Sequence, residues 1–284
     1  MCLPPGCGWV DDGWVTERFE VRRDGAILAG FRWPGDEKTV VLLHEGVADS
    51  RGWDELASLL APSLTVVAYD RRGHGQTPVS TEEFTHLDDL LAVLDEVGGS
   101  PVWLFGASAG GGLALDAALA APDRLAGVIV TGPAVSGSPE PELDPDTQRF
   151  DSLLEKAYEV RDQAELNRLE TWLWLDGPAQ DEGRVGGAAR ELALDMNAVI
   201  IRNGVPEDTG ASGVDAWSRL AEIRLPVTVM CGDLDVPFVV DRCRKVADLI
   251  PGARHHVLAA MAHQPYLESA STVAELIRAA IAGS

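Results

Sequence analysis

Short apolar runs alternate with amphipathic stretches along most of the chain. Residues 15–22 and 26–33 alternate apolar and polar positions around Asp24-Gly25, which predicts an antiparallel hairpin. Apolar runs typical of buried strands lie at residues 39–43, 65–69, 102–105, 126–131 and 227–231, and a shorter strand pattern at residues 255–258. Helical spacing of apolar residues separates them, as at Leu87, Leu90 and Leu94, and residues 265–282 have the pattern of a closing amphipathic helix. The alternation predicts an α/β fold with a mostly parallel eight-stranded sheet and helices on both faces.

Residues 133–214 break this rhythm. This segment is rich in acidic residues and has helical patterns at residues 150–175 and 185–201, and no strand is needed to explain it. We therefore expect a core built from residues 1–132 and 215–284, with residues 133–214 inserted as a helical cap. Trp172 and Trp174 are candidates for the wall of a substrate pocket, and the alternative is that they pack the cap helices together.

A serine marks the turn between one predicted strand and the next helix. Gly106-Ala107-Ser108-Ala109-Gly110 follows the apolar run 101–105 and precedes the Ala/Leu-rich stretch 113–121. In this context a Gly-x-Ser-x-Gly motif places the hydroxyl on a sharp strand-to-helix elbow. Such a serine becomes a nucleophile when a base takes its proton and N–H donors hold the oxyanion. The alternative is a glycine-rich turn that only lets the helix pack on the sheet.

Composition narrows the range of partners. Lys plus Arg number 23 and Asp plus Glu 45, so the formal net charge is −22. Phosphate backbones and anionic lipid surfaces would repel such a chain, whereas neutral or cationic small molecules suit it. The alternative is that the charge is solvated surface that only keeps the protein soluble. The first residues lack a signal-peptide pattern and no apolar run approaches about 20 residues, so we expect a soluble cytoplasmic protein that binds neither nucleic acid nor membrane.

Sequence features give no reason to expect a metal or a cofactor. The four cysteines have neither metal-ligand spacing nor the pattern of a disulfide framework: Cys2, Cys7, Cys231 and Cys243. Gly110-Gly111-Gly112 is not followed by the lysine of a phosphate-binding loop.

Two downstream loops carry the partners that a nucleophilic serine needs. Gly232-Asp233-Leu234-Asp235 follows the strand 227–231, and Ala262-His263-Gln264 follows the last strand. In open α/β sheets such loops at the carboxyl ends of strands bind ligands. The order serine, acid, histidine is the order found on hydrolase sheets with this elbow.

With these motifs, the sequence from about residue 15 to residue 282 resembles the α/β-hydrolase family, in its esterase, enol-lactonase and haloperoxidase-like branch. Two further stretches share the resemblance, at residues 42–46 (Leu-Leu-His-Glu-Gly) and residues 69–77 (Tyr-Asp-Arg-Arg-Gly-His-Gly-Gln-Thr). The resemblance implies that Ser108 is the nucleophile, His263 the base and Asp235 the acid. Asp233 is the alternative acid, because it lies in the same loop.

The resemblance also implies an oxyanion hole formed by the N–H groups of Ala109 and Gly46. Glu45 departs from the family pattern, which has a glycine at its position. A carboxylate beside a developing oxyanion opposes catalysis unless it is paired or points away. We expect Glu45 either to turn outward toward Arg51, Arg71 or Arg72, or to contact a polar or cationic group of the substrate.

These features predict a cofactor-independent serine hydrolase that cleaves a small carboxylic ester or lactone through an acyl-enzyme. Dehalogenases and epoxide hydrolases of this fold carry an aspartate at the elbow, so Ser108 excludes them. A carbon–carbon bond hydrolase and a perhydrolase use the same triad and stay open as alternatives. A non-catalytic ligand receptor on the same scaffold is the alternative from another class.

Overall fold

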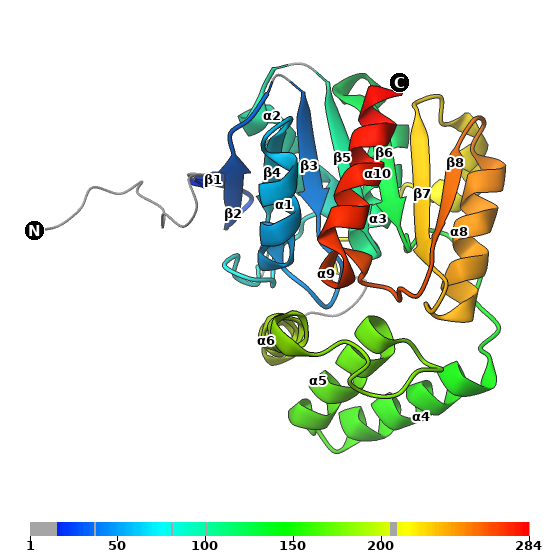
Figure 1. The fold of residues 1–284 in the computed structure, drawn as a ribbon. Helices are drawn as coiled ribbons and strands as arrows, with labels where there is room; N and C mark the ends of the chain where they lie inside the picture. The colour runs from blue at the N-terminus through cyan, green and yellow to red at the C-terminus, as the bar shows by residue number, and fades with distance from the viewer. Residues whose placement is uncertain (1–15, 37, 81, 100, 205–208, 284) are drawn as a thin grey trace, which may run out of the picture.

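The computed structural model describes residues 16–36, 38–80, 82–99, 101–204 and 209–283. An eight-stranded sheet in the order β1-β2-β4-β3-β5-β6-β7-β8 forms its centre (Figure 1). The edge strand β1 pairs antiparallel with β2, β2 pairs antiparallel with β4, and all other neighbours are parallel. The strands are β1 (Glu17–Arg23), β2 (Ala26–Trp33), β3 (Thr39–Leu43), β4 (Thr65–Tyr69), β5 (Val102–Ala107), β6 (Leu125–Thr131), β7 (Val227–Gly232) and β8 (Arg254–Leu258). The predicted sheet is confirmed.

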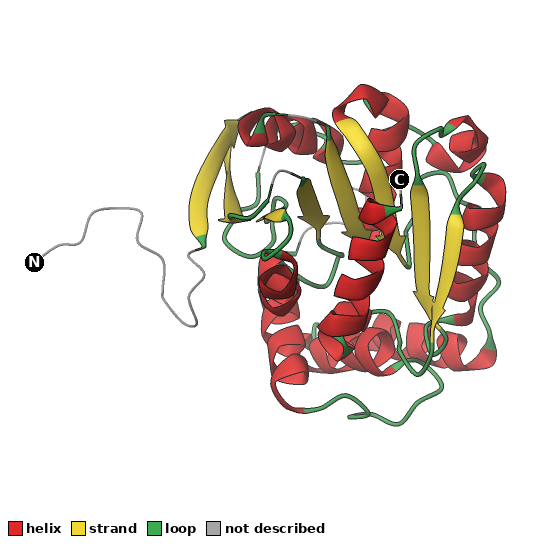
Figure 2. Cartoon of the chain, turned by 45° about the horizontal axis from the view of Figure 1, so that its top comes forward, coloured by secondary structure: helices red, strands yellow, loops and turns green. Residues whose placement is uncertain are grey.

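The inner parallel strands are mostly apolar because both faces of the sheet are covered there, whereas the edge strand β8 is largely exposed. Successive side chains point to opposite faces, so Val40 and Leu42 of β3 join one buried cluster and Val41 and Leu43 the other. The first cluster includes α1 (Asp54–Leu60) and α10 (Ala270–Ala282). Helices α2 (His86–Val97), α3 (Ala109–Ala120) and α8 (Pro237–Leu249) cover the other face, as Figure 2 also shows.

Several short helical turns complete the core. A 3₁₀ turn, η1 (Ser50–Trp53), precedes α1. The others are η2 (Pro122–Arg124), α7 (Ala216–Arg219), η4 (Leu220–Glu222) and α9 (Pro265–Glu268). The sequence predicts one continuous helix over residues 265–282, and this is wrong. Ser269, with φ −154° and ψ 80°, leaves the helical region and separates α9 from α10.

The segment 133–214 contains no strand among its described residues and forms a helical layer beyond one end of the sheet (Figure 1). Its helices are α4 (Pro145–Glu159), α5 (Gln163–Thr171) and α6 (Gly187–Asn203), with a five-residue π-helical turn, η3 (Trp172–Asp176), after α5. The helical patterns expected at residues 150–175 correspond to most of α4, to α5 and to much of η3, and Arg161, with a φ of +56°, lies in the break between α4 and α5. We call residues 133–214 the cap.

Both ends of the cap are tied to the elbow helix α3. Ser136, near the start of the cap, donates a 2.6 Å hydrogen bond to Asp116 Oδ1, and Ser212, near its end, donates to Asp116 Oδ2. The N–H of Trp217 donates to the carbonyl of Ser136 at 2.9 Å. The cap therefore leaves and rejoins the core at one buried carboxylate.

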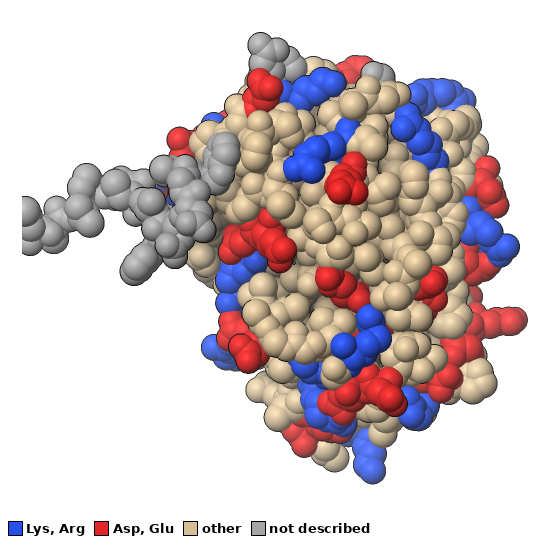
Figure 3. All heavy atoms as spheres, in the orientation of Figure 1, with Lys and Arg blue, Asp and Glu red and all other residues tan. Residues whose placement is uncertain are grey.

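Charged side chains of both signs are dense over the cap and sparse over α10 on the face shown in Figure 3. On this face Asp and Glu are interspersed with Lys and Arg rather than gathered in one field. None of the helices in the described part of the chain is both long enough and apolar enough to span a bilayer.

Candidate active site

Ser108 occupies the turn between β5 and α3 in a conformation that few residues adopt. Its φ is +48° and ψ −114°, a strained combination for a residue with a side chain. The surrounding hydrogen bonds hold it there: its N–H donates to Thr131 O and its carbonyl accepts from Gly112 N and Ala134 N, each at 2.9 Å. Ser108 is half-buried, whereas β5 before it is fully buried.

The elbow needs glycine at position 110 because the backbone of residues 43–44 passes very close. A Cβ on Gly110 would lie 2.1 Å from Leu43 O and 2.7 Å from His44 O, which no side chain tolerates. The first turn of α3 therefore packs directly against the loop that follows β3. This contact holds the start of α3 against Leu43 and His44, which directly precede Glu45 and Gly46.

His263 and Asp235 form a buried pair at the ends of β8 and β7. His263 Nδ1 lies 2.8 Å from Asp235 Oδ2, and Asp235 Oδ1 accepts the N–H of Val236 at 2.7 Å. A carboxylate only accepts, so Nδ1 carries the proton and Nε2 is left as the acceptor. Burial opposes a charge on His263, but the charge and hydrogen bond of Asp235, with the charge of Glu45, raise its pKa.

Gly132 brings the elbow and the histidine together. It follows Thr131, whose carbonyl holds the N–H of Ser108, and it has a φ of +52°. A Cβ at Gly132 would lie 2.7 Å from His263 Cε1 and 3.4 Å from Asp235 Oδ2. The backbone beside Ser108 therefore touches the ring of His263. Within the described residues no hydrogen bond joins Ser108 Oγ to His263, a contact that is often loose without substrate.

The cap contacts His263 through its π-helical turn. The N–H of His263 donates to Trp174 O at 3.2 Å, and the two rings lie 4.7 Å apart between centroids. Such π turns are frequent at functional sites. Trp172 has different neighbours, because its ring meets Phe150 edge-on at 5.0 Å and its Nε1–H donates to Gln180 O. The structure thus places Trp174 at the site and Trp172 within the cap.

Three buried side chains fix the path of the loop after β3. His44 Nδ1 and Arg71 donate to Glu45 O at 2.8 and 2.9 Å, and His74 Nε2 lies 3.1 Å from Gly46 O. His44 Nε2 accepts the N–H of Arg71, so its Nδ1 is the protonated nitrogen. In a trans peptide the N–H points opposite to the carbonyl, and capture of Glu45 O therefore aims the Gly46 N–H away from these donors.

Glu45 points inward and is 1% exposed, so it does not turn outward, which was one of the two orientations expected from the sequence. Its Oε1 accepts from the Gln264 amide and, at 2.8 Å, from the Tyr266 hydroxyl. Its Oε2 is buried, has no hydrogen-bond partner among the described residues, and lies 3.9 Å from His263 Nε2. Burial raises the pKa of Glu45, although His263, Gln264 and Tyr266 act in the opposite direction.

None of the three arginines pairs with the Glu45 carboxylate. Arg51 binds Asp49 and Asp195, and Arg72 binds Asp89. Arg71 reaches only the Glu45 carbonyl, and burial lowers its pKa to about 10. The sequence had no signal for the orientation of Glu45, because its partners Gln264 and Tyr266 lie more than 200 positions away.

The remaining candidates lie apart from this cluster. Asp233 is exposed and accepts the Ala260 N–H at 2.7 Å. Cys231 and Cys243 are free and buried, while Cys2 and Cys7 lie outside the described residues. Among the residues that the structure describes, no group of three or more His, Cys, Asp or Glu side chains is arranged to hold a metal.

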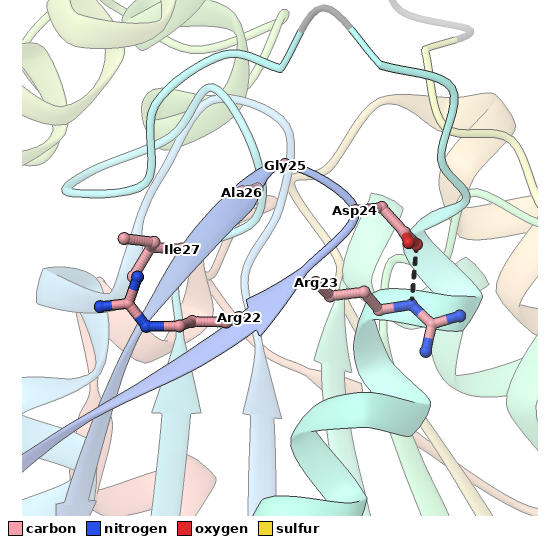
Figure 4. Close-up of a pocket in the computed structure, with 6 residues that line it drawn as sticks. All are labelled: Arg22, Arg23, Asp24, Gly25, Ala26 and Ile27. Carbon is pink, nitrogen blue, oxygen red and sulfur yellow. Dashed lines mark ion pairs between the residues drawn. The ribbon is translucent and has the colours of Figure 1, made fainter.

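A hollow at the β1–β2 hairpin, shown in Figure 4, is lined by basic side chains but is not part of this cluster. Arg23 is paired with Asp24 at 3.1 Å, the ion pair drawn there, and Arg22 with Glu20 at 3.3 Å. These cations are already paired with carboxylates. The hairpin joins the edge strand β1 to β2, and β2 lies three positions along the sheet from β5.

The fold and this arrangement of strand-end loops define a hydrolytic enzyme. The family model described as alpha/beta hydrolase fold matches residues 38–270, and the chain belongs to that family. It is 27% identical over 267 residues to the pimeloyl-[acyl-carrier protein] methyl ester esterase of Serratia marcescens, covering 87% of this chain and 94% of that protein.

Two solved structures share the fold. The esterase RhEst1 from Rhodococcus sp. ECU1013 superposes with a TM-score of 0.75 at 22% identity, covering 93% of this chain and 98% of that one. The enol-lactonase from Burkholderia xenovorans LB400 superposes with a TM-score of 0.72 at 19% identity, covering 91% and 98%.

Proposed function

We propose that this hydrolase cleaves a small carboxylic ester or lactone with Ser108 as nucleophile, His263 as base and Asp235 as the acid that orients it. The observation that carries the proposal is the position of Ser108: a strained elbow whose neighbour, Gly132, touches the ring of a histidine already hydrogen-bonded to a carboxylate. The relatedness to a methyl ester esterase, and the fold shared with an esterase and an enol-lactonase, support the same bond type.

In the proposed reaction Ser108 Oγ attacks the carbonyl carbon and its proton passes to His263 Nε2. The carbon–oxygen bond to the alcohol then breaks, and the alcohol oxygen takes that proton. The alcohol of an ester leaves, whereas the hydroxyl of an opened lactone stays on the acyl group. Water adds to the acyl-enzyme with His263 again as base, and the acid product and free Ser108 result. Asp235 keeps the Nδ1 proton in place throughout, so Nε2 always faces the reaction.

The oxyanion would be held by the N–H groups of Ala109 and Gly46. Ala109 begins α3, where N–H groups are free of helical partners, and the Gly46 peptide is oriented by its captured neighbours. Trp174 is the proposed wall of the substrate pocket. Trp172 packs inside the cap, and the burial of Glu45 favours a role through His263 over direct contact with substrate.

The test is a panel of chromogenic short-chain esters and lactones, assayed with wild type, Ser108→Ala and the matched variant Ser58→Ala. Ser58 is exposed on α1 and bonds only the Asp54 carbonyl. Ser108→Ala should lose at least about 10³-fold in kcat/KM, since the nucleophile is removed while binding is kept. Ser58→Ala should match wild type.

A fluorophosphonate probe, which reacts with activated serines, gives a second measurement that needs no substrate. Stoichiometric labelling at Ser108, found by peptide mass spectrometry, is expected. An unlabelled Ser108 would show a non-catalytic receptor instead. Ser108 could also be labelled while the enzyme turns over no ester or lactone but cleaves a carbon–carbon bond in a β-diketone. That result would show a carbon–carbon bond hydrolase instead of an esterase or lactonase.

A further inference from the structure

Glu45 places a second carboxylate at the histidine, on the side opposite to Asp235. Asp235 Oδ2 bonds Nδ1 at 2.8 Å, while Glu45 Oε2 lies 3.9 Å from Nε2. Nε2 is the nitrogen that takes and returns the serine proton in the proposed reaction. The ring therefore lies between two buried carboxylates, one bonded and one at ion-pair distance.

The two oxygens of Glu45 have different surroundings. Oε1 accepts hydrogen bonds from Gln264 and Tyr266, which anchor the side chain to the residues just after His263. Oε2 is buried with no partner among the described residues. A buried acceptor without a donor is costly, and its cost falls when a positive charge forms beside it. His263 provides that charge only when Nε2 is protonated.

We propose that Glu45 is a positioning residue whose carboxylate is the second counter-charge of His263 and stabilises the imidazolium formed when His263 takes the proton of Ser108. This proposal rests on the proposed function of Ser108 and His263. The attraction exists in the transition state and is absent while the ring is neutral, so it lowers the barrier rather than strengthening binding.

The same carboxylate has an opposing effect, because a negative charge near the oxyanion hole raises the energy of the oxyanion. Its anchoring decides the balance. Gln264 and Tyr266 hold Glu45 toward the histidine loop, and Oε2 has His263 Nε2 within 3.9 Å. We therefore expect the effect on His263 to dominate.

Other titratable and charged groups lie near His263 and Glu45. His263 faces Asp235 from the loop after β7 and feels the opposing charge of Arg242 on α8. Glu45 faces Tyr266 and the more distant Asp235, and the buried Arg71 lies beneath its loop. Trp174, which covers His263 from the cap, carries no charge. Glu45 is thus the one carboxylate of this group on the Nε2 side.

The experiment measures the rate of fluorophosphonate labelling of Ser108 against pH for wild type and Glu45→Gln. Glutamine keeps an acceptor for Gln264 and Tyr266 but has no charge. The midpoint of the rise in rate should move to lower pH by about 1 to 3 pH units, because the imidazolium loses a counter-charge within 4 Å. The plateau rate at high pH should fall, by up to about tenfold for each pH unit that the midpoint moves.

Glu268→Gln is the matched control. Glu268 is a largely buried carboxylate in the same region, but it binds the Ala262 N–H and Arg184 and does not face His263. Its midpoint should equal that of wild type. Glu45→Asp keeps the charge on a shorter side chain and should give an intermediate midpoint, which also tests the proposal if Glu45→Gln does not fold.

An unchanged midpoint, an equal change of midpoint in Glu268→Gln or a higher plateau rate in Glu45→Gln would each overturn the proposal. If wild-type Ser108 is not labelled at all, the proposed function fails, and the role of Glu45 is tested separately. In that case the ring titration of His263 is followed by NMR in Ser108→Ala with and without Glu45→Gln. A lower midpoint in the double variant supports the counter-charge, and equal midpoints overturn it.

Discussion

The loop after β7 and the loop after β3 each bring one carboxylate to His263, and the two differ in how they are satisfied. Asp235 uses one oxygen for His263 Nδ1 and the other for the Val236 N–H. Glu45 bonds its neighbours through one oxygen and leaves the other unpartnered near Nε2. The first contact is complete before any reaction begins, whereas the second gains a partner only when the ring is charged.

This difference assigns separate effects to the two loops. Asp235 fixes which nitrogen of His263 carries the proton, so removal of the Asp235 carboxylate should affect activity at every pH. The Glu45 loop changes how readily the other nitrogen accepts a proton, so its effect should depend on pH. Substitutions that alter one loop and leave the other intact therefore separate the two effects.

The largest effect is expected for Asp235→Asn. An asparagine amide would favour the wrong tautomer of His263, and kcat on a short-chain chromogenic ester should fall by about 10⁴-fold. Asp233→Asn is the matched control, because Asp233 lies in the same loop as Asp235 but is exposed. Among the described residues its side chain accepts the Ala260 N–H of the loop after β8 and does not contact His263. An equal loss in both variants would show that Asp235 has no special role.

Next in size is Gly132→Ala, which disturbs the contact between the elbow and the His263–Asp235 pair. The added Cβ would lie 2.7 Å from His263 Cε1, and displacing the ring by about 1 Å should lower kcat about 10²-fold. Gly183→Ala serves as control, since Gly183 also has a positive φ, +87°, but open space around it.

Both glycine variants should lose stability from backbone strain, about 1–3 kcal/mol each, measured as the free energy of unfolding in urea. Gly132→Ala should also lose kcat, whereas Gly183→Ala should keep the kcat of wild type. Full activity in Gly132→Ala would mean that the ring of His263 is free to move away from Gly132 without loss of function.

The sequence motifs point to residues that the structure places in loops after strands of the parallel sheet. Ser108, Asp235 and His263 follow β5, β7 and β8, and a parallel sheet brings its carboxyl ends to one edge. The strand bounds at residues 39–43 and 65–69 match the structure for the same reason: short apolar runs between turns leave little freedom.

What the sequence did not predict depends on contacts between distant residues or on local helix geometry. The inward turn of Glu45 is set by Gln264 and Tyr266 from the far end of the chain. Trp172 and Trp174 are two positions apart and equally apolar. In the π-helical turn the ring of Trp172 faces Phe150 and the ring of Trp174 faces His263. The break at Ser269 is hidden because apolar spacing continues across it.

A smaller effect is expected where the cap contributes to the environment of His263. Trp174→Ala removes the ring that lies 4.7 Å from His263, and kcat/KM should fall by up to about tenfold, the value of one aromatic contact. Trp172→Ala removes a ring of the same size from Phe150 and should lower the melting temperature with little change in kcat/KM. The reverse pattern would place the substrate against Trp172.

The smallest effect concerns the stability of Glu45→Gln. Burial raises the pKa of Glu45 above its usual value of 4.5, so the folded state holds this proton more tightly than the unfolded chain. The resulting contribution to stability is fully present below pH 4.5 and is lost as the pH rises through the folded-state value. Glutamine does not ionise and loses nothing over this window.

The free energy of unfolding of Glu45→Gln should therefore rise relative to that of wild type as the pH increases from 4.5 through the folded-state pKa of Glu45. The total difference should be about 1.4 kcal/mol for each pH unit that separates the folded and unfolded pKa values. Urea unfolding at several pH values measures the difference, and a constant difference would contradict the assigned burial cost. A wild-type enzyme that is less stable than Glu45→Gln at about pH 8 but labels faster would show that the carboxylate serves His263 rather than the fold.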